Sequence, residues 1–221
     1  MVIAIDGPAG AGKSTVTRLL AQRLGFAFLD TGAMYRAVTL AAVKRNVSWD
    51  ATDELLQLAG QLTIQFDGES VFLDSVDVTE EIRTPEVTRN IFHIADHPGI
   101  RDILVKLQRE IAASGNYVCE GRDQGTVAFP DAALKIYLDV SPQHRAIRRV
   151  EQMESDGKFV DIDQVIIDQK VRDQRDLNRP VGRLMRAVDA IEVNTDNKSV
   201  DAVIEELEAL AKSRMSSTGS N

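Results

Sequence analysis

The chain of 221 residues lacks several features that would place it in a common class of protein. Cys119 is the one cysteine, so an intrachain disulfide is excluded, and its place in an apolar run predicts a buried, inert thiol. No apolar stretch approaches the roughly 18 residues of a membrane helix, and no basic, apolar signal peptide opens the sequence. We therefore expect a soluble protein of the cytoplasm.

Basic charge is also in short supply. The sequence has 26 lysine and arginine residues against 34 aspartate and glutamate residues, which gives a net charge of −8. Proteins that coat nucleic acids or membrane surfaces are usually basic, so we expect neither kind of partner. The arginines nevertheless gather at 145–149 and 172–186. Such clusters in an acidic protein predict a local anion-binding site.

Two familiar motifs are missing as well. The nearest run to the guanine-reading N-K-x-D is Asn197-Lys198-Ser199-Val200, which lacks the aspartate, so we do not expect a GTPase. The three histidines show no metal-ligand spacing, and we interpret them as structural; they are His93, His97 and His144.

What the sequence does contain is a phosphate-binding loop. Residues 7–14 fit G-x-x-x-x-G-K-[ST] at every defined position, between the apolar run Val2–Ile5 and a helical pattern at Lys13–Leu24. Backbone N–H groups of such a loop surround a polyphosphate, while Lys13 can reach its outer phosphates and the Ser14 hydroxyl can hold Mg²⁺. We therefore predict that ATP or another nucleoside triphosphate binds at Gly7, Pro8, Ala9, Gly10, Ala11, Gly12, Lys13, Ser14 and Thr15, with Ser14 as a metal ligand.

Apolar runs separated by helical patterns predict an α/β fold with a doubly wound parallel sheet. Alternating β-branched residues around a glycine turn at 62–79 predict a small antiparallel insert. The polar segment 151–163 predicts a mobile flap, and the polar tail 213–221 is expected to be disordered. The five runs expected to form strands are Val2–Ile5, Ala27–Leu29, Tyr117–Cys119, Leu134–Leu138 and Ile191–Val193.

Two polar segments follow predicted strands, at the sheet edge where such folds collect ligands. In Asp30–Arg36 a glycine turn precedes Arg36, which could bind a second ligand; a helix capped by Asp30 or Thr31, with Arg36 in solvent, explains the pattern equally well. In Glu120–Thr126 two glycines accompany a charge pair at a strand end, and this combination favours a ligand site.

Further arginines lie on predicted helices. Arg172, Asp176 and Arg179 share one face before Pro180, either as a solvated row of ion pairs or as ligands for phosphate and a ribose hydroxyl. Arg101 would by itself be a surface residue of the helix Ile100–Ile111. Three more arginines could bridge transferring phosphates or form a basic helix face; they are Arg145, Arg148 and Arg149.

Together these motifs resemble the bacterial cytidylate kinases, a family of nucleoside-monophosphate kinases, from Ile3 to about Asp196. The most specific segments are Gly121–Val127 and Arg172–Arg179, and Asp30–Arg36 and Glu81–Val87 also match. The resemblance implies one P-loop kinase domain over 1–221, with a five-stranded parallel sheet, a monophosphate-binding region at 31–110 and a lid at 145–170. It also implies ATP- and Mg²⁺-dependent phosphorylation of CMP and dCMP. Because long edge strands are absent, we expect a monomer.

The resemblance further implies roles for individual residues. Those matching Arg36, Arg122 and Arg172 bind the acceptor phosphate in the family, and those matching Arg101 and Asp123 read the base, whose donors and acceptors suit this pair. Phe92 departs from the pattern, since the family usually has a small hydroxyl residue there; Thr88, the backbone or the aromatic ring would have to replace it. The expected acceptor site comprises Thr31, Arg36, Arg101, Arg122, Asp123, Arg172, Asp176 and Arg179, and the expected catalytic cations are Lys13, Arg148 and Arg172.

The implied reaction needs charge neutralisation more than a general base. The acceptor is a phosphate with a second pKa of about 6, so it is largely ionised at neutral pH. We predict that the flap at 151–163 and the insert at 62–90 close over the nucleotides and exclude water. The alternatives are a kinase for UMP or shikimate, and a nucleotide sensor without turnover.

Overall fold

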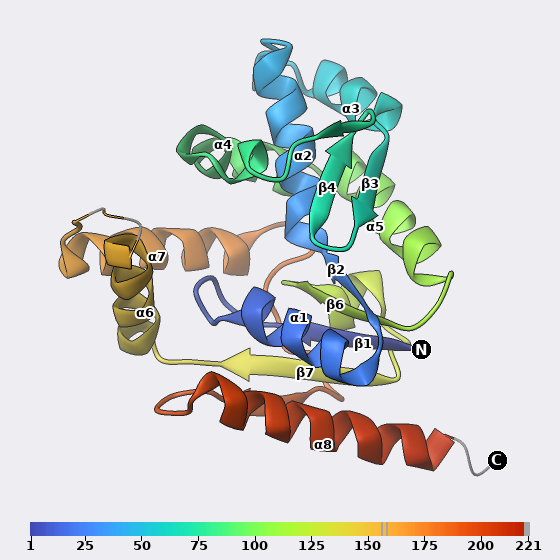
Figure 1. The fold of residues 1–221 in the computed structure, drawn as a ribbon. Coiled ribbons are helices and arrows are strands. Elements are labelled where there is room, and N and C mark those ends of the chain that lie inside the picture. The colour runs from blue at the N-terminus through green and yellow to red at the C-terminus, as the bar shows by residue number, and fades with distance from the viewer. Residues whose placement is uncertain (156, 158, 219–221) are drawn as a thin grey trace. The chain divides into compact units, whose positions relative to one another are not determined.

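The computed structural model describes residues 1–155, 157 and 159–218 of the chain (Figure 1). It divides into two compact units, where the sequence led us to expect one domain with an inserted region. The first unit combines Met1–Ala27 with Asn116–Asn221, and the second is Phe28–Gly115. The predicted monophosphate-binding region at 31–110 falls inside the second unit.

A five-stranded parallel sheet has the strand order β2-β6-β1-β7-β8. Strand β1 pairs in parallel with β6 and β7, and β7 pairs in the same way with β8. All five predicted strands are confirmed, although the edge strands β2 and β8 are only partly buried. The bounds are β1 Val2–Asp6, β2 Ala27–Asp30, β6 Tyr117–Gly121, β7 Leu134–Asp139 and β8 Ile191–Asn194.

The register of the sheet brings strand ends together. Asp6, the last residue of β1, is paired with Gly121 of β6 and with Tyr137 of β7. The segments that leave β1 and β6 therefore start side by side at the carboxyl edge of the sheet. Residues 3–6 of β1 are all buried, so this edge rests on the apolar centre of the unit.

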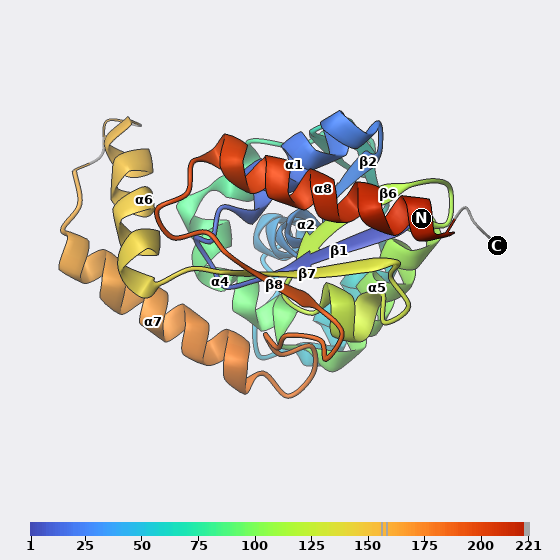
Figure 2. The same ribbon diagram turned by 90° about the horizontal axis from the view of Figure 1, so that it is seen from below.

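The helices of the first unit flank this sheet. Helix α1 (Lys13–Leu24) matches its predicted bounds and packs against β6 and α8 (Val200–Thr218), which lies alongside it (Figure 2). Helix α6 (Pro142–Ser155) packs against α7 (Ile162–Asn178). The break expected at 151–163 is therefore shorter than predicted, because both helices extend into it.

The expectation of a disordered tail from 213 is wrong as far as Thr218, because α8 continues to that residue. A row of buried apolar side chains anchors the helix before its polar end, and residues 219–221 lie outside the described part. The row comprises Val203, Ile204, Leu207 and Ala211.

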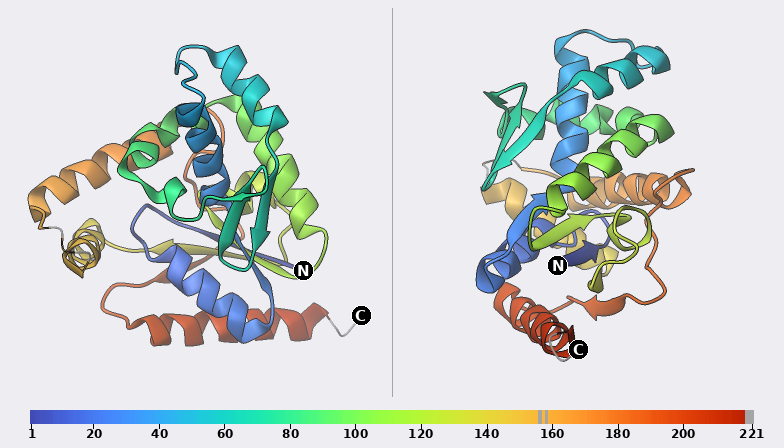
Figure 3. Two further views of the ribbon diagram at one scale, coloured as in Figure 1. Left: turned by 45° about the horizontal axis from the view of Figure 1, so that its top comes forward. Right: turned by 90° about the vertical axis from the view of Figure 1, so that its right-hand side faces the viewer.

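The second unit joins helices to a small sheet. Its strands β3 (Ile64–Asp67), β4 (Ser70–Leu73) and β5 (Val76–Asp77) form an antiparallel sheet, which confirms the predicted insert. Helix α2 packs against the other long helices of the unit (Figure 3). The helical bounds are α2 Thr31–Lys44, α3 Thr52–Gln61, η1 Glu81–Arg83, α4 Pro85–Ala95 and α5 Pro98–Ala112.

Candidate functional site

The phosphate loop joins β1 directly to α1. Gly12 has φ 78°, a left-handed conformation that disfavours residues with a Cβ, and it precedes the first helical residue, Lys13. Because glycine has no capping side chain, the first-turn N–H groups of α1 remain suited to phosphate oxygens. The predicted strand–loop–helix setting is thus present.

Lys13 is buried, and its Nζ donates a hydrogen bond to the carbonyl oxygen of Pro8 at 2.8 Å. Burial lowers the pKa of Lys13 well below its ordinary value, and the charges of Arg122 and Arg172 lower it further. An ammonium crowded by guanidinium groups is stabilised when an anion arrives between them. The surroundings of Lys13 therefore suit a polyphosphate.

Ser14 and Thr15 follow on the exposed side of the first turn of α1. Among the residues that the structure describes, no group of three or more histidine, cysteine or carboxylate side chains could hold a metal ion. Mg²⁺ bound to nucleotides usually takes its ligands from phosphates, waters and one or two protein oxygens. The hydroxyl of Ser14 fits that donor set.

Helices α6 and α7 both contact the phosphate loop. Arg145 is buried, donates to the carbonyl oxygen of Ala9 at 2.9 Å and pairs with Asp173 of α7 at 2.6 Å. Arg148 donates to the backbone oxygen of Thr195 at 2.7 Å. Its Nη1 lies 3.8 Å from the position of a Cβ built on Gly12. Neither Arg145 nor Arg148 belongs to a solvated basic face, whereas Arg149 is exposed.

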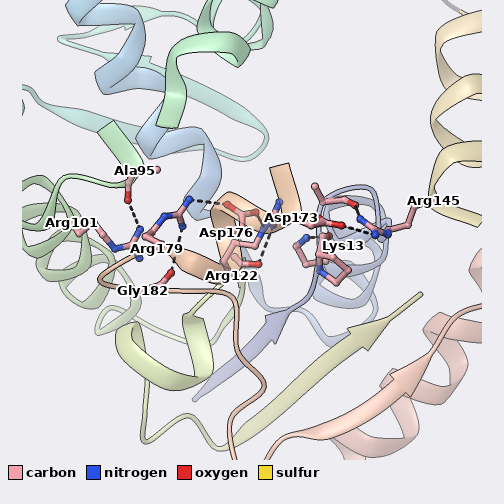
Figure 4. Close-up of polar contacts among 12 residues, drawn as sticks. Lys13, Ala95, Arg101, Arg122, Arg145, Asp173, Asp176, Arg179 and Gly182 are labelled. Carbon is pink, nitrogen blue, oxygen red and sulfur yellow. Dashed lines mark hydrogen bonds and ion pairs between the residues drawn. The ribbon is translucent and has the colours of Figure 1, made fainter. Parts of the chain in front are cut away.

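A network of charges links the end of β6 with α7 (Figure 4). Asp176 accepts from Arg122 Nε through one carboxylate oxygen and from Arg179 Nη2 through the other, each at 2.8 Å. Burial raises the pKa of Asp176, but the two guanidinium groups outweigh it and the net pKa is lowered. Arg179 also donates to the carbonyl oxygen of Gly182 at 3.4 Å.

This network bears on the interpretation of α7 as a solvated row of ion pairs. Asp176 and Arg179 are buried, so the prediction of a wholly solvated row is wrong for them, while Arg172 is exposed. Asp123, the predicted base reader, is buried directly after Arg122. The structure therefore brings Arg122, Asp123, Asp176 and Arg179 together in the unit that contains the phosphate loop.

The remaining predicted acceptor residues belong to the second unit. Asp30 caps α2 by accepting from the N–H of Ala33 at 2.9 Å, as the capping interpretation predicted. Arg36 is half-buried, not in open solvent, and its Nη1 donates to Ile82 O at 3.1 Å and to Thr88 Oγ1 at 2.9 Å. The capping interpretation is therefore right for Asp30 and wrong for Arg36.

Arg101 is also buried in the second unit, contrary to its interpretation as a simple surface residue. Its Nη1 donates to Ala95 O at 3.0 Å (Figure 4). Its guanidinium carbon lies 5.2 Å from the centroid of the Tyr35 ring. Thr31 is buried at the start of α2. Phe92 packs against His93, with ring centroids 4.0 Å apart.

Other residues behave as structural elements. Burial raises the pKa of the Cys119 thiol, in keeping with the predicted inert side chain. His97 accepts the N–H of Ile100 at the start of α5, and His93 stacks on Trp49. His144 contacts Ser141 and Asn197. Within the described ranges, no helix has both the length and the apolar composition for crossing a membrane.

Sequence reasoning missed two contributors to this region. No role was predicted for Asp6, although its carboxylate accepts the N–H groups of Gln124 and Gly125. Asp173 was not singled out, although it binds Arg145 beside the phosphate loop. The position of Asp6 directly after a predicted strand could have indicated a role in the site. Nothing in the helical pattern distinguishes Asp173 from its neighbours.

Comparison with known proteins gives a consistent result. The family model described as cytidylate kinase matches residues 3–213. A cytidylate kinase of Rhodopirellula baltica is 46% identical over 221 residues, covering 100% of this chain and 96% of that protein. One from Caldanaerobacter subterraneus subsp. tengcongensis is 44% identical over 211 residues, covering 95% and 94%.

A solved structure agrees on the fold. The crystal structure of a gluconokinase from Sinorhizobium meliloti 1021 superimposes with a TM-score of 0.50 at 16% identity, covering 100% of this chain and 97% of that one. At this identity the likeness concerns the fold alone.

Proposed function

The chain belongs to the cytidylate kinase family, and on that premise we propose that it transfers the γ-phosphoryl group of ATP to CMP or dCMP, giving ADP with CDP or dCDP. The observation that carries the proposal is the group of cationic side chains beside the phosphate loop. Lys13 is buried there, and the positive charges of Arg122 and Arg172 help to lower its pKa. Asp176 binds both Arg122 and Arg179. A protein that only bound ATP would have little use for this second set of cations.

Phosphoryl transfer between two anions is limited by their repulsion. In the proposed reaction, Lys13 binds the outer phosphates of ATP, and Arg148 and Arg172 offset the charge that builds on the transferring group. Arg145 holds the loop in shape, since its guanidinium already binds Ala9 O and Asp173. No side chain has to remove a proton, because the acceptor phosphate is already ionised.

We propose Mg²⁺ as the metal, held by the Ser14 hydroxyl and the phosphates of ATP. When bound, it neutralises phosphate charge and aligns the oxygens for transfer. Ser14 supplies an oxygen ligand on the exposed side of the first turn of α1. Both carboxylate oxygens of Asp6 are committed to backbone N–H groups, so this neighbouring acid is not assigned to the metal.

The family resemblance supports the proposed roles in acceptor recognition. Arg36, Arg122 and Arg172 bind the phosphate of CMP, and Thr31 lies at the start of the helix that carries Arg36. The pair Asp176 and Arg179 faces the sugar. Arg101 as a donor and Asp123 as an acceptor are proposed to read cytosine, whose acceptors and donors suit them.

A panel of acceptors tests the proposal directly. The full chain is incubated with ATP and Mg²⁺ and with CMP, dCMP, UMP or shikimate, and ADP formation is followed. We expect turnover with CMP and dCMP well above the other two. ADP formation only with UMP or shikimate would replace the acceptor, and tight nucleotide binding without ADP from any acceptor would identify a sensor. We also expect a monomer acting in the cytoplasm, which sedimentation and cell fractionation would check.

A further inference from the structure

Asp6 occupies a junction between two segments of the proposed site. It is the last residue of β1, directly before Gly7, and the register pairs it with Gly121 of β6. Both carboxylate oxygens are used: Oδ1 accepts the backbone N–H of Gln124 and Oδ2 that of Gly125, each at 2.8 Å. The residue is 4% exposed. The start of the phosphate loop is thus bonded to the segment that follows Asp123.

The segment held in this way is the π-helical turn η2 (Gln124–Ala128). At its far end, the carbonyl oxygen of Asp123 accepts the N–H of Val127 at 2.8 Å and that of Ala128 at 3.1 Å. At its near end, the N–H groups of Gln124 and Gly125 bind Asp6. The backbone that presents Arg122 and Asp123 is therefore fixed by β6 on one side and by the Asp6 carboxylate on the other.

Gly125 lies close to both Asp6 and Lys135. A Cβ built there would lie 3.4 Å from Asp6 Oδ2 and 3.2 Å from Lys135 Cδ. A Cβ would therefore touch the carboxylate at an ordinary contact distance and crowd the lysine stem, and a branched side chain would have to move the turn or the lysine. Position 125 thus leaves little room for a side chain between Asp6 and Lys135.

Stability alone does not account for a carboxylate in this place. Burial raises the pKa of Asp6 from 3.8 to about 6, against the opposing effect of its two backbone hydrogen bonds. Since the pKa is raised on folding, ionisation of Asp6 opposes folding as the pH rises through that interval. The ionisable groups that face it are Lys13 of α1, Asp123, Cys119 of β6 and Tyr137 of β7, with Lys135 behind Gly125.

We propose that Asp6 is a positioning residue for the acceptor, whose carboxylate fixes the backbone of Arg122 and Asp123 so that these side chains meet CMP correctly. The inference rests on the proposed function and adds a residue to it. The phosphate loop has supports that do not depend on this carboxylate, because strand pairing holds β1 up to Asp6 and Arg145 binds Ala9 O within the loop. Loss of the Asp6 carboxylate should therefore weaken the acceptor far more than ATP.

The test compares Asp6→Asn with the wild-type full chain. Calorimetry gives the dissociation constants of CMP alone and of ATP with Mg²⁺, and steady-state assays separate kcat from KM. The amide keeps the shape of Asp6 but turns an NH₂ group toward a backbone N–H. We expect CMP affinity to fall about tenfold, equivalent to ~1.4 kcal/mol, with ATP affinity nearly unchanged.

A matched control is Asp189→Asn. It removes a carboxylate that binds Lys135 at 2.9 Å, behind the same turn but without a bond to its backbone N–H groups. We expect this variant to retain the wild-type ratio of CMP to ATP affinity, even if its stability falls. An equal selective loss of CMP binding in the control would show that general loosening, and not the Asp6 contact, is responsible.

Several outcomes would overturn the inference. Unchanged CMP affinity in Asp6→Asn would overturn it, and so would equal losses of affinity for CMP and ATP. If Asp6→Asn does not fold, Gly125→Val decides. Its methyl groups would extend beyond a Cβ that already lies 3.4 Å from Asp6 Oδ2, and would move the turn away from an intact Asp6. A selective loss of CMP binding supports the inference, and its absence rejects it. A wild-type chain that forms no ADP with CMP would reject the proposed function and the inference with it, whereas failure in the variants rejects the inference alone.

Discussion

Asp176→Asn should cause a large loss of stability, because Asp176 is the shared partner of two guanidinium groups. Its oxygens lie 2.8 Å from Arg122 Nε and 2.8 Å from Arg179 Nη2, and the side chains of Asp176 and Arg179 are 8% and 7% exposed. Removing one partner of a buried ion pair costs roughly 3–5 kcal/mol. Asparagine keeps one acceptor oxygen and Arg122 is 18% exposed, so we expect the lower end of that range.

The assay is urea and thermal unfolding at neutral pH. For a chain of this size, a loss of about 3 kcal/mol corresponds to a fall in Tm of roughly 6–12 °C. Burial raises the pKa of Asp176, yet Arg122 and Arg179 lower it more. The contribution of this carboxylate is therefore complete above its ordinary pKa of 3.8 and disappears as the pH falls below that value. The difference between wild type and variant should shrink in acid.

Glu206→Gln is the control for this prediction. Glu206 pairs with Lys198 at 2.6 Å, but the two side chains are 42% and 37% exposed. An exposed pair contributes about 0.2–1 kcal/mol, so this variant should unfold close to the wild type. Equal losses in the two variants, or a difference for Asp176→Asn that persists unchanged below pH 3.8, would refute the reasoning.

Three further predictions concern activity. Lys13→Ala should leave unfolding midpoints almost unchanged and lower kcat by roughly 10²-fold or more; near-normal turnover would remove the phosphate loop from the mechanism. Asp123→Ala should raise the dissociation constant of CMP far more than that of ATP in calorimetry. Equal losses of affinity for the two nucleotides would contradict its role in reading the base. The ratio of CMP affinity in the wild type to that in Asp6→Asn should be largest above pH 6 and decline as Asp6, with a pKa of about 6, is protonated. The substrate phosphate titrates alike in both proteins, so a ratio that does not change with pH would contradict the positioning role of Asp6.

Much of the fold could be predicted because local patterns decided it. The run Val2–Ile5, the glycine loop and the apolar spacing of Lys13–Leu24 specify a strand, a tight turn and a helix without distant information, and the structure confirms each. The polar tail was wrongly predicted to be disordered, because packing earlier in the chain and not local composition determines its structure. Buried residues such as Leu207 and Ala211 anchor α8 earlier in the chain, and the helix then continues through residues whose own composition favours disorder.

The sequence predicted which residues belong to the candidate site, but not which of them pair with one another. The spacing of Arg172, Asp176 and Arg179 gives a shared helical face, yet their burial differs. Asp176 binds Arg122 and is buried, whereas Arg172 is exposed. Likewise, nothing in the cluster of Arg145, Arg148 and Arg149 shows which guanidinium turns toward Ala9. Such choices depend on the packing of α6 and α7 against the phosphate loop, and sequence periodicity carries no information about it.

The contacts of Asp6 and Arg145 suggest why the phosphate loop is linked to so much of its unit. Asp6 bonds the residue before the loop to the turn after Asp123, and Arg145 bonds Ala9 within the loop to Asp173 of α7. In each link a charged side chain binds a backbone atom, and such bonds are shorter and stronger than neutral ones. The segments proposed to hold ATP and CMP thus share fixed points, and alignment for in-line transfer depends on such fixed points more than on any reactive side chain.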